Sequence, residues 1–330
     1  MSALPFLMAS STYIADVLRR PPARSFFGKL KGGDEVSYLI TLACTVSILV
    51  VVGLIVCELW LNSQPTVHTF GWKFLTSSAW DPNSGNFGAL PFVYGTCVTS
   101  ALALIIAIPL GVASAIFLAE MAPPKLSNFL TFLIELLAAV PSVIYGLLGI
   151  FILVPLIREY LVPALRGAFG YLPMFSGPFY GVSLLSAGLV LSVMVVPFIV
   201  SVSREVLIAV PREQREAALA LGATKWETTW DIVLPNASTG ILGSVFLALA
   251  RALGETMAVT MVVGNTPQIA ASLFAPGYSI AAVIANEFAE ANGRLYVSSL
   301  IFLGLVLFGL TIVINAVARI LILVTTKRAS

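Results

Sequence analysis

The sequence predicts an all-α, polytopic membrane protein with about six transmembrane helices, and three observations support this fold class. First, 58% of the 330 residues are hydrophobic and only 10% are charged, far fewer charges than a soluble domain carries. Second, the mean hydropathy of +0.98 comes from long apolar stretches that polar segments separate. Third, Lys and Arg residues are unevenly divided among those polar segments, as in the loops on the two sides of a membrane.

The apolar stretches follow one another along the chain. A spanning helix needs about 20 mostly apolar residues to cross a hydrocarbon core about 30 Å thick. The stretches that meet this requirement are residues 36–61, 92–119, 129–156, 181–202, 240–263 and 296–324. Pro109, Pro141 and Pro197 interrupt the second, third and fourth of them. Each proline is either a packing kink or an opening between helices, because membrane helices tolerate such breaks where neighbours or water satisfy the freed backbone groups.

The basic residues predict that both termini are cytoplasmic. With the N-terminus inside, the outer segments hold Lys73, Arg158, Arg166 and Arg294, and all other Lys and Arg residues outside the spans lie inside. The basic residues of the first 30 follow the mildly apolar start, so this segment does not have the order of a signal peptide. We expect a cytoplasmic segment at 1–35, a transmembrane domain at 36–324 with a cytoplasmic loop at 203–239, and a cytoplasmic tail at 325–330.

Few residues are suited to catalysis or metal binding. The three cysteines lack the paired spacing of a zinc site, and His68 is the only histidine. The sequence has no G-x-x-x-x-G-K-[ST] phosphate loop, and a net charge of +2 gives no argument for nucleic acid. We therefore expect no catalytic residue, metal site or cofactor on this chain, and no enzymatic activity of its own.

The inner loop at 203–239 has the most informative pattern. Residues 216–221 are strong helix formers, and Gly222 is a natural stop for a helix. Thr224 can cap a second short helix, with Glu227 in the capping-box position three residues later. The loop should therefore form two short helices that meet at a glycine.

The second of these helices has an aromatic face. Trp226 and Trp230 are four residues apart, so both rings lie on one side, and Pro235 should then turn the chain back into the membrane. Such a helix either inserts into a groove on a partner protein or lies at the lipid headgroups.

The same loop resembles the EAA signature of ABC-importer permeases, E-A-A-x3-G-x9-I-x-L-P. The sequence matches the signature at every fixed position, namely Glu216, Ala217, Ala218, Gly222, Ile232, Leu234 and Pro235. In that family the loop forms the coupling helix, which docks into a cleft of a separate ATP-hydrolysing subunit. The resemblance implies a type I ABC importer permease fold, with ATP and Mg bound by the partner ATPase.

Further stretches resemble the PstC permeases of phosphate-specific ABC importers. They are GALPFVYGT at 88–96, ELLAAVPSVIYG at 135–146, ARALGETMAV at 250–259 and GNTP at 264–267, and the resemblance covers about residues 36–324. It implies transport of phosphate through the inner or plasma membrane. It also implies a second permease of the PstA type, two PstB-type ATPase subunits and a PstS-type phosphate-binding protein.

Two charged residues lie inside the fifth stretch. A charge at mid-membrane costs roughly 3 kcal/mol or more, so Arg251 and Glu255 are candidate functional residues, and their spacing predicts one helical face. A neighbouring stripe of small residues predicts close helix packing: Ser244, Ala248, Ala252 and Thr256. The pair is either a structural ion pair, or Arg251 donates to a phosphate in transit while Glu255 orients it. The resemblance associates these positions with transport.

The remaining acidic residues in or near the spans give weaker indications. Glu135 has no assigned role, whereas Glu287 and Glu290, near a short helix expected at 279–291, should be solvated or paired with the binding protein. A permease for sulfate or molybdate is the alternative within importers. A self-contained channel or a secondary transporter is a further alternative, but the sequence lacks the internal repeat that many secondary transporters have.

Overall fold

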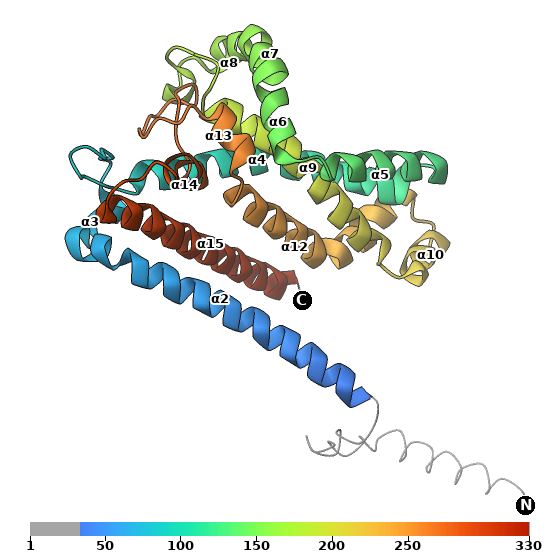
Figure 1. The fold of residues 1–330 in the computed structure, drawn as a ribbon. Helices are drawn as coiled ribbons and strands as arrows, with labels where there is room; N and C mark the ends of the chain where they lie inside the picture. Colours follow the sequence, from blue (N-terminus) through green and yellow to red (C-terminus); the bar gives the residue numbers. More distant parts are fainter. Residues whose placement is uncertain (1–33, 330) are drawn as a thin grey trace, which may run out of the picture. The chain divides into compact units, whose positions relative to one another are not determined.

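The computed structural model describes residues 34–329, and the predicted all-α fold is confirmed (Figure 1). Within this range the regular structure is helical, apart from an isolated bridge between Asp81 and Asn86. The elements are α2 (Asp34–Phe70), α3 (Lys73–Thr76), α4 (Leu90–Ile116), η2 (Phe117–Met121), α5 (Pro124–Ala138), α6 (Ser142–Leu148), η3 (Gly149–Leu153), α7 (Val154–Leu156), η4 (Ile157–Leu161), α8 (Val162–Phe169), η5 (Pro173–Phe175), α9 (Leu184–Ile208), α10 (Arg212–Ala220), α11 (Lys225–Glu227), η6 (Thr228–Val233), α12 (Leu234–Leu253), α13 (Met257–Val262), α14 (Ile280–Glu287) and α15 (Arg294–Ala329). The expected N-terminal segment at 1–35 lies outside the described residues, except for its last two.

Within residues 34–329, six helical segments are long and apolar enough to cross a membrane, as predicted. They are Ser37–Phe70, Leu90–Met121, Ser142–Phe169, Leu184–Ile208, Lys225–Leu253 and Arg294–Val317. Pro109 and Pro197 lie inside continuous helices, α4 and α9. The expected tail at 325–330 continues α15 as a helix as far as the described chain extends.

The chain divides into two units, Met1–Glu58 and Leu59–Ser330. In the first unit, the described part of α2 has apolar side chains that are exposed; Ile48 and Leu49 are 64% and 67% exposed. Lipid can cover such a mostly apolar helix, because its backbone groups are bonded within the segment.

The first span is longer than predicted, because α2 continues past Leu61 to Phe70. Thr66 is completely buried, and its hydroxyl lies 2.9 Å from that of Ser298 and 3.1 Å from that of Ser299 in α15. Because these buried hydroxyls satisfy one another, the polar residues do not need the solvent contact of a loop, and the helix persists.

The third span was predicted wrongly, because one stretch at 129–156 is divided in two. Helix α5 ends at Ala138, and a new helical segment begins at Ser142, directly after Pro141. Proline has no N–H to donate and disfavours a helical conformation at the residue before it. With 15 residues, α5 is about 22 Å long and too short to span a membrane alone.

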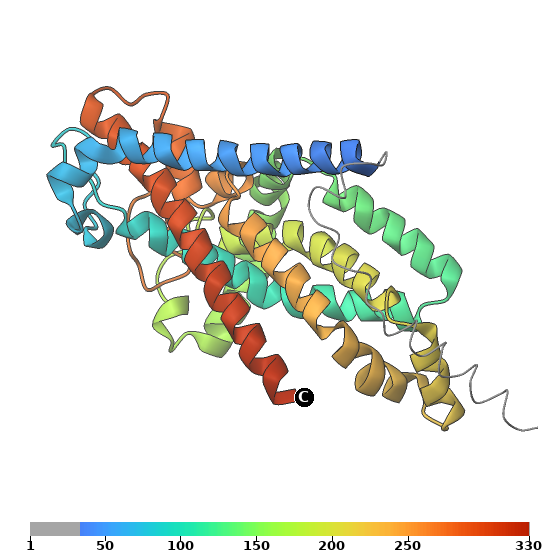
Figure 2. The same ribbon diagram turned by 90° about the horizontal axis from the view of Figure 1, so that it is seen from below.

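Helix α9 is the central helix of the second unit. It lies beside α4 and α12, as Figures 1 and 2 show. Small residues allow the close approach to α4: a Cβ at Gly111 would lie 2.7 Å from a methyl of Ile199, and one at Gly188 would lie 2.5 Å from Leu102. The helix begins at Leu184 because the Ser183 side chain accepts a hydrogen bond from the Ser186 N–H.

The segments at the far end of the bundle from α10 are joined by aromatic side chains. The rings of Trp80, Phe87, Phe92 and Tyr296 lie within 4.7–6.2 Å of one another in the pairs that contact. Aromatic rings bury much apolar area at each contact, and edge-to-face pairs add specific stabilisation. This aromatic cluster therefore fixes the loop before α4 to the start of α15.

Glu287 was predicted to be solvated or paired with the binding protein, but it is hydrogen-bonded within the chain. It is the last residue of α14, and its Oε2 accepts hydrogen bonds from Trp80 Nε1 at 2.9 Å and from the Tyr296 hydroxyl at 2.7 Å. Glu290 is exposed. The predicted short helix in this loop is present as α14, although its first turn is buried and Ile280 N–H donates to Thr96 at 3.0 Å.

Replacing Gly95 by Val should destabilise the protein by about 3 kcal/mol or more, because the first added carbon already clashes with backbone. A Cβ at Gly95 would lie 2.1 Å from the carbonyl oxygen of Tyr278. Thermal unfolding of the purified protein in detergent measures the effect. Gly243→Ala is the control, because its Cβ would meet nothing within 4 Å, and an equal loss in both variants would contradict the contact.

Candidate functional site

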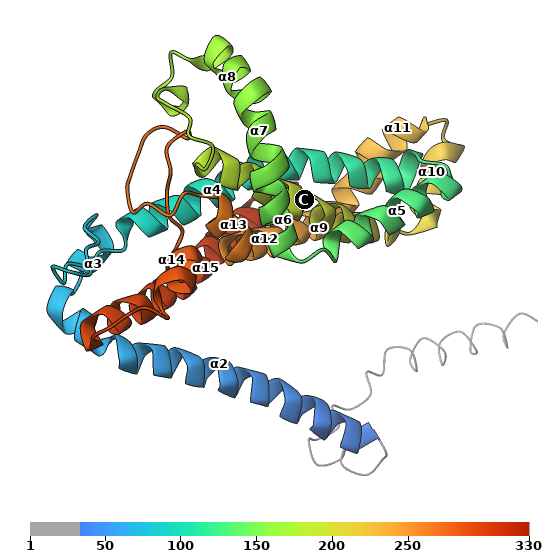
Figure 3. The same cartoon turned by 45° about the horizontal axis from the view of Figure 1, so that its top comes forward.

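The EAA signature residues lie on a segment that we call the docking element, residues 212–235. Its first helix, α10, contains Glu216, Ala217 and Ala218 and has no buried residue. Figure 3 shows α10 and α11 together at the end of the bundle that also holds α5, with α8 lying away from them. The signature is therefore presented at the surface of one end of the bundle.

Gly222 ends α10 as predicted. It has φ of +91°, the left-handed region that glycine enters without steric cost. The N–H of Gly222 donates to the carbonyl of Leu219 at 3.0 Å, and the N–H of Ala223 donates to that of Ala218 at 3.1 Å. These two bonds make a Schellman motif, which satisfies carbonyls that the end of a helix would otherwise leave unpaired.

The predicted capping box is confirmed. The Thr224 hydroxyl accepts from the Glu227 N–H at 3.2 Å, and the Glu227 carboxylate accepts from the Thr224 N–H at 2.7 Å. The rings of Trp226 and Trp230 are stacked with centroids 5.5 Å apart, and both side chains are more than half exposed. The aromatic face is thus free in the isolated chain.

The second helix of the docking element is not short, and Pro235 does not turn the chain. Helix continues from Lys225 without a break to Leu253, through the π-helical turn η6 and Pro235 at the start of α12. A π-turn bonds each N–H five residues back and widens the helix, so it accommodates the missing N–H of a proline and its ring. The docking element and the fifth span therefore share one helix.

A groove of about 540 Å³ runs between α10 and this helix. Its apolar lining includes Ala217, Ala218, Leu221 and Ile232, and Leu221 is 90% exposed. Of the other signature residues, Leu234 is half-buried and Pro235 is exposed. An apolar surface of this kind is suited to a protein partner.

Glu120 and Arg215 form an ion pair that the sequence did not identify. Arg215 on α10 lies 2.8 Å from a carboxylate oxygen of Glu120 in η2, 95 positions earlier. Glu120 directly follows the predicted second span and Arg215 lies within the predicted inner loop, and nothing in a single sequence indicates a pair at that separation. It joins the docking element to the end of the second span.

Arg251 and Glu255 do not share a helical face, so this prediction was wrong. Helix α12 ends at Leu253, and Glu255 lies in the break before α13. The Glu255 carboxylate accepts a hydrogen bond from the Ala258 N–H at 3.1 Å, and the described chain has no ion pair between the two residues. Glycine at 254 favours the end of the helix, and Glu255 then satisfies the start of α13.

The two faces of α12 differ as the small-residue stripe predicts. Ser244, Ala248 and Ala252 are buried, and the Ser244 hydroxyl lies 2.7 Å from that of Ser203 in α9. Thr256 lies beyond the helix. Arg251 is on the exposed side, with its guanidinium carbon 6.0 Å from the centre of the Phe198 ring.

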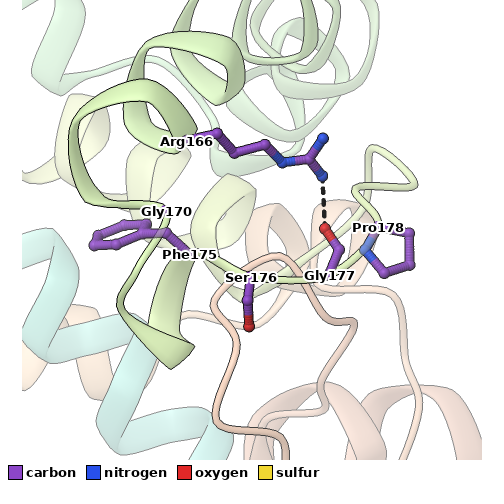
Figure 4. A pocket seen from close by; sticks show the side chains of 6 residues that line it. All are labelled: Arg166, Gly170, Phe175, Ser176, Gly177 and Pro178. Carbon is purple, nitrogen blue, oxygen red and sulfur yellow. Dashed lines mark hydrogen bonds between the residues drawn. The ribbon is translucent and has the colours of Figure 1, made fainter.

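A second pocket lies at the opposite end of the bundle, with a volume of about 540 Å³ (Figure 4). Arg166 in α8 donates from Nη2 to the carbonyl of Gly177 at 2.6 Å, and its guanidinium carbon lies 5.4 Å from the centre of the Phe274 ring. Arg158 donates in the same way to the carbonyl of Tyr180 at 2.8 Å. These arginines hold the loop before α9. Among the described residues, no three metal-ligating side chains lie together.

Comparisons with known proteins agree over most of the chain. A family described as binding-protein-dependent transport system inner membrane component matches residues 107–325. The "Phosphate transport system permease protein PstC" of Mesorhizobium japonicum is 45% identical over 294 residues, which cover 88% of this chain and 90% of that protein. The protein of the same name from Pasteurella multocida is 47% identical over 278 residues, covering 83% and 87%. A chain of the inward-facing MetNI methionine ABC transporter structure superimposes with a TM-score of 0.48 and 17% sequence identity. The match covers 69% of this chain and 95% of that chain.

Proposed function

We propose that this chain, which belongs to the family of binding-protein-dependent transport system inner membrane components and within it to the PstC permeases, is the permease subunit of an ATP-driven phosphate importer. It is a multi-pass membrane protein with six candidate spans. It would form half of the path across the membrane, and the hydrolysis of ATP would take place on another chain of the complex.

The docking element is the single observation that supports coupling to an ATPase most directly. Exposed signature residues on α10 lie beside an apolar groove. The Schellman motif at Gly222 fixes the C-terminal end of α10 and with it one side of this groove. A short amphipathic helix with an apolar flank is suited to insertion into a cleft of a second protein. The ATPase, with its bound ATP and Mg, would supply that cleft.

The shared helix explains how a movement at the docking element would reach the membrane. Helix runs from Lys225 to Leu253, so displacement of its exposed end must also displace the part that lies in the membrane. We infer alternating access, in which closure of the ATPase pair moves the docking element and opens the path toward the outer side. Hydrolysis would then return it to the inward-facing state.

Arg251 is the residue that we assign to the phosphate path. It lies on the exposed side of α12, three residues before the break at Gly254. A charge that faces lipid at mid-membrane costs about 3 kcal/mol, so this face requires cover by a partner or by a water-filled path. The guanidinium offers forked donors to an oxyanion, and Glu255 in the adjoining break would limit how tightly the anion is held.

The partners follow from this arrangement. The exposed face of α12 would meet a second permease of the PstA type, and two PstB-type ATPases would meet the docking elements. A PstS-type phosphate-binding protein would contact the opposite end, where Arg158 and Arg166 lie. Both termini would be cytoplasmic, because the helices that lie together at the end of the docking element in Figure 3 carry basic residues: Lys125 in α5, Arg212 in α10 and Lys225 in α11.

Phosphate, and not sulfate or molybdate, should stimulate the transporter. The experiment reconstitutes the four kinds of subunit in vesicles and measures ATP hydrolysis with each binding protein and its anion. We expect stimulation only with the phosphate-loaded protein. Stimulation by a sulfate- or molybdate-binding protein would favour the alternative importer, and uptake by this chain alone would contradict the proposal.

A further inference from the structure

Apart from the Schellman motif at its C-terminal end, helix α10 is held in place mainly by one side chain, with little apolar packing. It has no buried residue, and the buried apolar cluster beneath it, which includes Ala115, Leu207 and Val233, contains no residue of α10. Pro211 precedes it and Gly222 follows it, so both of its connections are short bends. A helix without a buried apolar face must be positioned by polar contacts.

Arg215 makes these contacts with two separate parts of the chain, η2 and the C-terminal end of α9. Its Nη2 and Nε donate to the two carboxylate oxygens of Glu120 at 2.8 and 3.3 Å. Nη2 also donates to the carbonyl of Leu207 at 2.7 Å, and Nη1 donates to the carbonyl of Val210. The side chains of Arg215 and Glu120 are only 18% and 12% exposed.

The carbonyl acceptors explain why an arginine is required. Leu207 lies in the last turn of α9, where carbonyl groups lack the usual partner four residues later, and its carbonyl accepts a 3.3 Å bond from the N–H of Val210, two residues beyond the helix. A cation at this end also interacts favourably with the helix dipole. The planar fork of arginine reaches both carbonyls and the carboxylate together, whereas a lysine has a single ammonium group.

Glu120 depends on Arg215 in turn. It lies in the π-turn that ends the helix Leu90–Met121, and a negative charge at the C-terminal end of a helix is unfavourable. A mostly buried carboxylate without a partner would be more unfavourable still. The guanidinium therefore holds the ends of α4 and α9 and the helix α10 together at one point.

We propose that Arg215 is the positioning residue that makes α10 move as one body with α4 and α9, so that force from the ATPase reaches both spans. This role rests on the proposed function. Without the clamp, which consists of Arg215, Glu120 and the carbonyls of Leu207 and Val210, α10 would still dock but would pivot at its two bends. ATP would then be hydrolysed without transport.

The test uses the complete reconstituted transporter and measures phosphate uptake and ATP hydrolysis in the same vesicles. For Arg215→Gln we expect normal assembly and continued ATP hydrolysis. The amount of phosphate taken up per ATP hydrolysed should fall at least about tenfold. Arg319→Gln is the control, since it removes the same charge from an exposed position of α15, outside the docking element, and should behave as wild type. Normal uptake per ATP in Arg215→Gln would overturn the proposal.

Two further variants separate the clamp from an ordinary ion pair. Glu120→Gln keeps an acceptor and both carbonyl bonds, so its defect should be smaller than that of Arg215→Gln. The exchange Arg215→Glu with Glu120→Arg should not restore uptake, because a carboxylate cannot donate to the carbonyls. Restoration by the exchange would overturn the proposal. The proposal would also be overturned if the Arg215→Gln complex failed to assemble while Glu120→Gln showed wild-type phosphate uptake per ATP.

A distance measurement tests the clamp apart from the identity of the anion. Spin labels are placed at Leu219→Cys on α10 and Ala113→Cys on α4, with the three native cysteines replaced. In the wild-type complex the mean distance between the two labels should be the same in the ATP-bound and nucleotide-free states. In Arg215→Gln the distribution of this distance should broaden. A wild-type distance that changes would refute the clamp, whereas absent phosphate uptake with a constant distance would refute only the proposed function.

Discussion

Replacing Gly222 by Val should lower ATP-driven phosphate uptake by about tenfold, since strain of about 1–2 kcal/mol at this position opens the end of α10. The φ of +91° is unfavourable for any residue with a Cβ, and most of all for a β-branched one. The strain can be relieved only by breaking the Schellman bonds from Gly222 and Ala223. Helix α10 would then lose its fixed angle to the fifth span. Uptake by reconstituted vesicles and co-purification of the ATPase measure the loss.

Gly222→Asn is the informative control for that experiment. Asparagine enters the left-handed region several-fold more readily than most residues, and it is similar in size to valine. A Cβ at Gly222 would meet nothing within 4 Å, so neither side chain is blocked by this chain itself. We expect the asparagine variant to retain most of the uptake. Equal defects in the two variants would show that side-chain bulk at the docking surface, and not backbone conformation, is decisive.

Replacing Arg251 by Ala should reduce phosphate uptake by about 100-fold, as expected when a bound oxyanion loses a desolvated, charge-assisted hydrogen-bond donor. The complex should still assemble, because Arg251 is exposed and makes no ion pair within the described chain. Uptake is measured alongside the subunit composition of the purified complex. Leu247→Ala, one turn earlier on the same exposed face, removes an apolar side chain from the proposed permease interface and therefore shows what loss of packing alone does to assembly and uptake. Normal uptake in an assembled Arg251→Ala complex would remove this residue from the phosphate path.

Because Arg251 and Glu255 are not paired in this structure, a double variant of the two residues has a specific expected result. Since Glu255 bonds the Ala258 N–H and not Arg251, the effects of Arg251→Ala and Glu255→Gln on thermal unfolding of the phosphate-free complex should add in the double variant. A large deviation from additivity would mean that the two side chains pair in another state of the transport cycle. Either result decides whether the ion-pair interpretation of the sequence applies during transport.

Local chemistry was the part of this structure that the sequence predicted well. The spans follow from apolar length, the stop at Gly222 follows from the freedom of glycine, and the capping box follows from the Thr224–Glu227 spacing. Each of these depends on residues a few positions apart. The EAA signature was therefore placed correctly on and after a short helix.

Features that depend on distant contacts were missed or misplaced. The continuation of helix through Pro235 depends on a π-turn, which has no reliable sequence signal, and the Arg215–Glu120 pair joins positions 95 residues apart. Glu287 was expected in solvent because its partners Trp80 and Tyr296 come from other segments. The break after Leu253 separated Arg251 from Glu255, although an uninterrupted helix would have paired them.

The unbroken helix from Lys225 to Leu253 has a mechanical consequence of its own. Its 29 residues measure about 43 Å from end to end at the rise of an α-helix. If its docking end were the fulcrum, a tilt of about 7° would sweep the Gly254 break sideways by about 5 Å, close to one helical pitch. The length of this one helix therefore sets how far the chain moves at the anion path for a given rotation at the ATPase.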